Sequence, residues 1–221
     1  MSEFLTHPVP ANFSNAEIGA LEYETMYRRS IDDPDGFWGD MAAQFLTWDK
    51  TWSTVVRSDF SKGDAQWFVD GKLNVSSNCI DRHLPHRAAQ TAFIWEGDNP
   101  DISKHISYAE LKDQVCKLAN TLKARGVKRG DRVCIYMPMV PEAAYAMLAC
   151  ARIGAVHSVV FGGFSPEALK DRILDSDCRV LITADEGLRG GKAIPLKNNA
   201  DKALTDCPNV HTCLTVKRTG G

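Results

Sequence analysis

The chain has 221 residues, of which 44% are hydrophobic and 24% are charged, and its formal net charge is −2. This balance is typical of a folded globular protein and excludes an intrinsically disordered chain. The small net charge offers no attraction to nucleic acid or to an anionic membrane surface, and no apolar run approaches the roughly 18 residues of a membrane-spanning helix.

The first residues lack a basic segment followed by an apolar stretch, so we expect no secretory signal. Seven cysteines are scattered along the chain without a CxxC pair, which indicates reduced thiols and a cytoplasmic protein. Cys79, His83 and His86 lie close in sequence, but no second pair of ligands follows them. We therefore predict no metal site.

Residues 1–85 differ in character from the rest of the chain. Apolar residues recur at helical spacing in residues 17–29 and 35–46, which predicts two helices. Four of the five tryptophans fall in this segment. Large aromatic side chains bury much area, so we interpret them as packing residues, with ligand stacking as the alternative. The segment is predicted to be mainly helical and to pack on the domain that follows.

Residues 86–221 alternate between short apolar runs and amphipathic stretches. Strands are predicted at residues 92–95, 132–136, 155–161, 180–183 and 211–216. Helices are predicted to begin at the capping box formed by Ser107 and Glu110, at Pro141, at Pro166 after the N-cap Ser165, and at Pro195. The alternation predicts an α/β fold of right-handed βαβ units, with a parallel sheet covered on both faces. Because the chain ends soon after a strand, we expect an interrupted domain.

Two loops follow strands of this sheet, at the edge where ligands bind in such folds. The first contains Phe161, Gly162 and Gly163 and leads into the helix that begins behind Ser165. Paired glycines permit close approach of the backbone to a ligand, and a helix N-terminus offers free amides to an anion. A tight turn without a binding role is the alternative.

The second loop, residues 186–192, places Gly190 and Gly191 between Arg189 and Lys192. Two cations with backbone amides between them suit phosphate oxygens, and a solvated basic turn is the alternative. The loop lacks the glycine and the Ser or Thr of a P-loop, and the absence of GxGxxG argues against a dinucleotide dehydrogenase. Two such loops on successive strands favour a nucleotide-like ligand.

Long stretches of the chain resemble one known family. They are NCIDRHL at 78–84, ISYAEL at 106–111, YMPMVPEAA at 136–144 and ACARIGAVHSVVFGGFSP at 149–166. In this order they are similar to the AMP-forming acetyl-coenzyme A synthetases, which are members of the adenylate-forming superfamily. The resemblance covers essentially the whole chain, including residues 67–74, and implies an incomplete N-terminal domain of such an enzyme.

The resemblance implies a ligase that joins acetate to ATP with the help of Mg²⁺ and then transfers the acetyl group to CoA. It implies a partial CoA site, made of Arg189, Gly190, Gly191, Lys192, Phe161, Gly162, Gly163 and Ile194. The family's ATP loop, acetate pocket and catalytic lysine come later than residue 221, so we expect no catalytic residue here and no activity of the chain alone. A propionate or other short-chain acyl-CoA ligase, or a non-catalytic module that binds CoA or another nucleotide, is the alternative.

Overall fold

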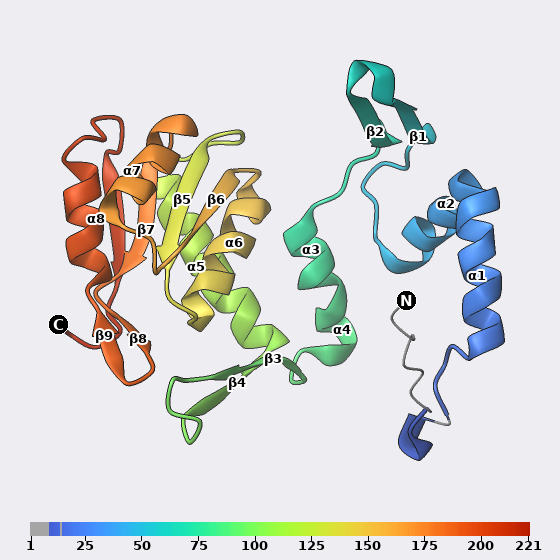
Figure 1. Ribbon diagram of the computed structural model, residues 1–221, viewed down its shortest axis with the longest axis horizontal. Coiled ribbons are helices and arrows are strands. Elements are labelled where there is room, and N and C mark those ends of the chain that lie inside the picture. The colour runs from blue at the N-terminus through green and yellow to red at the C-terminus, as the bar shows by residue number, and fades with distance from the viewer. Residues whose placement is uncertain (1–8, 14) are drawn as a thin grey trace, which may run out of the picture. The chain divides into compact units, whose positions relative to one another are not determined.

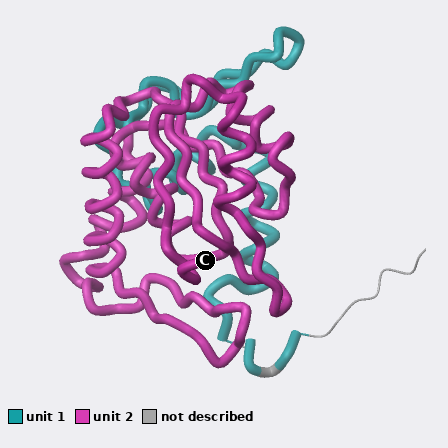
Figure 2. Tube along the Cα trace, turned by 90° about the vertical axis from the view of Figure 1, so that its left-hand side faces the viewer, with its two compact units in different colours: residues 1–72 teal, residues 73–221 magenta. Residues whose placement is uncertain are grey.

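The computed structural model describes residues 9–13 and 15–221. Its backbone divides into two compact units, Met1–Lys72 and Leu73–Gly221, coloured separately in Figure 2. The boundary that the sequence predicts, after residue 85, stays a prediction. Among the described residues no helix has both the length and the apolar character needed to cross a bilayer.

The first unit contains two helices and a β-hairpin. Its elements are η1 (Ala11–Phe13), α1 (Ala20–Asp32), α2 (Pro34–Phe45), β1 (Thr54–Asp59), η2 (Phe60–Lys62) and β2 (Asp64–Val69). The two predicted helices are present. Gly19 precedes α1 without a side-chain cap, whereas α2 has a clear start signal. Asp33 accepts a hydrogen bond from the Gly36 amide, and Pro34 occupies the first turn.

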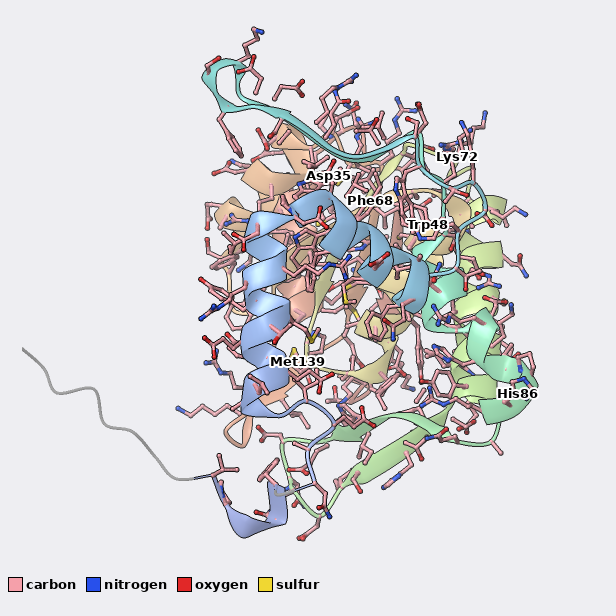
Figure 3. All side chains as sticks on the ribbon, turned by 90° about the vertical axis from the view of Figure 1, so that its right-hand side faces the viewer. Asp35, Trp48, Phe68, Lys72, His86 and Met139 are labelled. Atoms are coloured by element: carbon pink, nitrogen blue, oxygen red, sulfur yellow. The ribbon has the colours of Figure 1, made fainter. Side chains whose placement is uncertain are left out.

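The aromatic residues of the first unit pack against one another. The ring centroid of Trp48 lies 4.8 Å from that of Trp52. It lies 5.3 Å from that of Phe68, and both of these residues are labelled in Figure 3. The Trp48 indole N–H also donates to the Ala42 carbonyl at 3.0 Å. These contacts support the interpretation of Trp48 and Trp52 as packing residues, whereas Trp38 and Trp67 are 43% and 50% exposed.

The second unit is built on a four-stranded parallel sheet with the order β10-β7-β5-β6 (Figure 1). Its strands are β5 (Arg132–Met137), β6 (Val156–Phe161), β7 (Val180–Ala184) and β10 (Thr212–Val216), and its main helices are α5 (Tyr108–Ala124), α6 (Pro141–Ile153), α7 (Pro166–Asp175) and α8 (Leu196–Leu204). Since β6 and β7 lie on opposite sides of β5, right-handed crossovers place α6 and α7 on opposite faces. The predicted α/β fold with a parallel sheet is confirmed.

The helix ends follow the predicted signals. Ser107 and Glu110 form the capping box, with the Glu110 amide 3.2 Å from the Ser107 hydroxyl and the Ser107 amide 2.9 Å from the Glu110 carboxylate. The Ser165 hydroxyl accepts from the Ala168 amide at the start of α7. Gly154, with φ of +74°, ends α6 in the left-handed conformation that favours glycine.

The strand predicted at 92–95 is not part of the parallel sheet, which corrects the expectation of a simple βα alternation. It is β3 (Thr91–Glu96), and it pairs antiparallel with β4 (Ser103–Ser107) in a separate hairpin. A parallel crossover needs a dozen or more residues, and the short connection between these strands permits only a hairpin. The polar sequence of β4 gave no strand signal. The remaining elements are α3 (Val75–Cys79), η3 (Asp81–His83), α4 (Leu84–Arg87), β8 (Gly187–Arg189) and β9 (Lys192–Ile194).

The core of the second unit centres on β5. Val133, Cys134, Ile135 and Tyr136 have no exposed surface, because β5 lies between β6 and β7 and is covered by helices on both faces. All seven cysteines of the chain are free thiols. Cys134, Cys150, Cys178 and Cys207 are buried, whereas Cys79 is exposed. Burial raises the pKa of the Cys150 thiol to about 12.

An ion-pair network ties η3 to the helices of one sheet face. The two terminal nitrogens of Arg152, from α6, each lie 2.8 Å from an oxygen of the Asp81 carboxylate. Lys112 of α5 pairs with the same carboxylate. The Arg152 guanidinium, helped by Lys112, lowers the pKa of Asp81 from 3.8 to about 2 against the effect of burial. Asp81 therefore stays ionised and joins three elements at neutral pH.

Candidate nucleotide-binding site

A cavity of about 380 Å³ opens at the carboxyl ends of β5, β6 and β7. Its lining comes mainly from residues 137–139 after β5, 161–163 after β6, 187–189 after β7 and 96–98 after β3. The neighbouring strands β5 and β7 are followed by connections that run in opposite directions across the sheet, to β6 and to β10, and ligands of open α/β sheets bind at such a switch point. The cavity therefore lies where the fold favours a ligand.

The glycine pair after β6 forms one wall of the cavity. A Cβ atom on Gly162 would lie 3.2 Å from the Met137 carbonyl oxygen, and one on Gly163 would lie 2.5 Å from the Phe161 ring. A side chain at either position would displace its neighbours, so glycine is needed for this close packing.

Tyr136 of β5 contacts the turn that contains Gly162 and Gly163, a role that the sequence did not indicate. Its hydroxyl group donates to the Phe164 carbonyl at 2.8 Å and lies 3.2 Å from the Gly162 carbonyl oxygen. Asn199 of α8 lies 3.4 Å away, within reach to donate to the same hydroxyl. Burial raises the pKa of Tyr136, so the phenol keeps its proton at neutral pH.

The second predicted loop is a β-hairpin, which corrects the expectation of a loop. β8 and β9 pair through the partners Arg189 and Lys192, with Gly190 and Gly191 at the turn. The two glycines have φ of +57° and +73°, as a two-residue type I′ turn requires. Directly opposed side chains share a face of a hairpin, so Arg189 and Lys192 stand side by side.

The turn amides do not face the cavity as free donors, contrary to our expectation. The Gly190 amide donates to one oxygen of the Asp98 carboxylate at 2.7 Å, and the Gly191 amide donates to the other at 2.8 Å. A phosphate in this site would therefore meet the cationic side chains and not these amides. Asp98 and Gly190 are 92 residues apart in the sequence, and no local sequence pattern predicted their contact.

The structure brings the two predicted loops together. The Arg189 guanidinium carbon lies 5.5 Å from the centroid of the Phe161 ring, a cation–π arrangement at the mouth of the cavity. Of the predicted residues, those lining the cavity are Phe161, Gly162, Gly163, Arg189 and Ile194. Gly190, Gly191 and Lys192 lie beside it on the hairpin. The site thus combines an aromatic ring, an apolar wall and a cation with the carboxylates of Glu96 and Asp98.

Asp185, at the end of β7, holds a neighbouring segment in place. Its carboxylate accepts hydrogen bonds from the backbone amides of Arg218 and Gly220, each at 2.7 Å. Burial of Asp185 opposes its ionisation, but these backbone donors outweigh it and lower the pKa to about 2. Arg218 lies over the Trp95 ring at 5.0 Å, and the Trp95 indole donates to the Met139 carbonyl at 2.8 Å. The contacts fix one rim of the cavity.

Comparison with known proteins identifies the class to which this fold and site belong. The family model for AMP-binding enzymes matches residues 80–220, so the chain belongs to the family of AMP-binding enzymes. The model for the acetyl-coenzyme A synthetase N-terminus matches residues 23–79. The resemblance inferred from the sequence motifs is confirmed.

Individual relatives agree with this assignment. The chain is 67% identical to an acetyl-coenzyme A synthetase of Saccharophagus degradans, over 97% of this chain and 33% of that protein. It is 62% identical to acetyl-coenzyme A synthetase 2 of Pseudomonas aeruginosa, over 100% of this chain and 34% of that protein. An acetoacetyl-CoA synthetase from Streptomyces lividans has a similar structure, with a TM-score of 0.81 and 28% identity over 90% of this chain and 30% of that one. The chain therefore spans about a third of the length of these relatives.

Proposed function

We propose that the chain is the N-terminal part of an AMP-forming acetate–CoA ligase and contributes part of its CoA site. The whole enzyme would convert acetate, ATP and CoA to acetyl-CoA, AMP and pyrophosphate by way of acetyl-adenylate. The observation that carries the proposal is the convergence of Arg189 and Phe161 at the mouth of one cavity. Family membership and the relatives' names support it.

The chemistry of the cavity suits the nucleotide end of CoA. Adenine is a flat group that packs well between apolar and aromatic surfaces, which Phe161, the glycine pair and Ile194 would supply. The phosphates carry negative charge, and the guanidinium group of Arg189 can bind two phosphate oxygens at once. Lys192 would add a second positive charge from the same face of the hairpin.

The other substrates are assigned to the part of the enzyme that this chain does not span. We place the sites of ATP, Mg²⁺ and acetate there, since the relatives are about three times as long as this chain. Acetate is favoured over propionate by the matching N-terminal family model. We also propose a cytoplasmic location, which the free thiols support.

We expect no acetate-dependent exchange of pyrophosphate into ATP from the chain alone, because adenylation needs those missing sites. The measurement is a radiolabelled pyrophosphate exchange assay. The Saccharophagus degradans relative serves as the positive control. Exchange catalysed by this chain by itself would contradict the proposed division of the sites.

Substituting Arg189 tests the CoA site directly. The chain is joined to the remaining two-thirds of the Saccharophagus degradans relative, in place of the matching third, and acetyl-CoA formation is measured. We expect Arg189→Ala to raise the KM for CoA about tenfold, the effect of losing roughly 1.4 kcal/mol of binding. The KM for ATP should not change.

Arg125→Ala is the matched control, because Arg125 is an exposed arginine at the end of α5. An unchanged KM for CoA in Arg189→Ala would show that Arg189 is not part of the CoA site.

Calorimetry with the isolated chain distinguishes the proposed partial site from the second candidate function, a non-catalytic binding module. Tight CoA binding that Arg189→Ala abolishes would favour a self-standing binding module, whose cavity and cation are both present in this chain.

A further inference from the structure

Two hairpins that are far apart in sequence contribute residues to the lining of the cavity. The β3–β4 hairpin carries Asp98 in its connection, and the β8–β9 hairpin carries Gly190 and Gly191. Figure 1 shows both hairpins at the same, lower end of the second unit. The two amide–carboxylate hydrogen bonds between them, at 2.7 and 2.8 Å, join the tips.

We propose that Asp98 is a positioning residue, which fixes the turn of the β8–β9 hairpin and thereby holds Arg189 over Phe161 for binding CoA phosphate. This role rests on the proposed function of the site. Each oxygen of the carboxylate accepts one turn amide, so the contact sets both the place and the orientation of the turn. Arg189 is the residue next to that turn and lines the cavity.

The β3–β4 connection is itself well enough held to serve as an anchor. The Gly97 amide donates to the Ile102 carbonyl at 2.8 Å, and the Ile102 amide donates to the Asn99 carbonyl at 3.0 Å. The Asp101 amide donates to the Asn99 side chain at 3.0 Å. A short hairpin such as β8–β9, with three residues in each strand, gains most from an outside anchor of this kind.

The hydrogen bonds of Asp98 also reduce the repulsion that its carboxylate would exert on a bound phosphate. A carboxylate beside a phosphate site would repel the ligand if it were free. Here two amide donors share its charge, as they would share that of a bound anion. The alternative is that the carboxylate only occupies the amides until phosphate displaces it. The two readings predict opposite effects of removing the carboxylate.

The first test is spectroscopic and needs no ligand. In the amide proton–nitrogen spectrum of the isolated chain, Asp98→Ala should shift the Gly190 and Gly191 signals upfield, because both amides lose a charged acceptor. Asp98→Asn keeps one oxygen acceptor and should shift them less. Asp101→Ala removes the same charge from the same connection and should leave them in place. Unchanged signals in Asp98→Ala would overturn the proposal.

The second test uses the fusion with the relative described above. We expect Asp98→Ala to raise the KM for CoA about tenfold, close to the effect of removing Arg189 itself. The KM for ATP and the kcat at saturating CoA should stay within about twofold, which a general loss of structure would not allow. Asp101→Ala should leave the KM for CoA unchanged.

A double variant decides whether Asp98 acts through Arg189. If it does, Asp98→Ala combined with Arg189→Ala should raise the KM for CoA about tenfold, as either change does alone. A hundredfold rise would mean that the two residues act independently, and a lower KM in Asp98→Ala would mean that the carboxylate competes with phosphate. Either result overturns the proposal. If Arg189→Ala alone has no effect, the proposed function fails, while the amide signals still report whether Asp98 holds the turn.

Discussion

Replacing Ile135 with alanine should lower the free energy of unfolding of the second unit by about 3 kcal/mol. Ile135 has no exposed surface, and it lies in the central strand β5 opposite Val159 of β6 and Ile182 of β7. The substitution removes methyl and methylene groups and leaves a cavity that the strands on either side cannot close. Urea denaturation followed by circular dichroism measures the change.

Ile94→Ala is the matched control, because the same atoms are removed from a side chain that is 60% exposed in β3. We expect it to cost less than about 1 kcal/mol. Equal losses in the two variants would show that the parallel sheet does not form the core of the unit.

Replacing Asp81 with asparagine should cost about 2 kcal/mol at neutral pH, a value reduced from that of a fully buried pair because the side chain is partly exposed. The change keeps one oxygen acceptor but removes the negative charge that Arg152 and Lys112 share. Asp113→Asn is the control. Its partner is Lys117 in an exposed pair on α5, and we expect less than about 0.5 kcal/mol.

The pH dependence of the Asp81 network follows from the lowered pKa. The folded pKa of about 2 lies below the ordinary value of 3.8, so the folded state holds the proton less tightly than the unfolded chain does. The contribution of the network is therefore complete above about pH 4 and is lost as the pH falls toward 2. The difference between wild type and Asp81→Asn should shrink over that interval in urea titrations. A difference that stays constant with pH would contradict an ionic contribution.

The elements that the sequence predicted are those with a local signal. Ser107 and Glu110, Ser165 with Pro166, and Gly154 mark helix ends by chemistry that acts within a few residues. The buried strands of the parallel sheet were recognisable as apolar runs. Of the hairpin strands only β3 was predicted, and the others were missed because they are short and largely exposed, as the patterns of β1 and β2 show.

The candidate site could likewise be predicted only where the residues follow from the fold class. Phe161 ends β6 and Arg189 comes shortly after β7, and the carboxyl ends of these parallel strands meet at one edge of the sheet, so their proximity followed from the fold class. Asp98 and Tyr136 were missed because their roles depend on hydrogen bonds to residues 92 and 28 positions away. A carboxylate in a polar turn and a tyrosine in an apolar strand are ordinary in sequence.

Because some cysteines are buried and others are exposed, the rate at which each thiol is chemically modified can measure local opening of the native structure. A maleimide reagent should modify Cys79 in the native state, whereas Cys134, Cys150, Cys178 and Cys207 become accessible only when the second unit opens. Mass spectrometry of briefly labelled samples would then resolve opening at α6, β5 and the ends of α7 and α8 separately. No engineered probe is required, and the same labelling pattern can be compared with and without a nucleotide in the cavity.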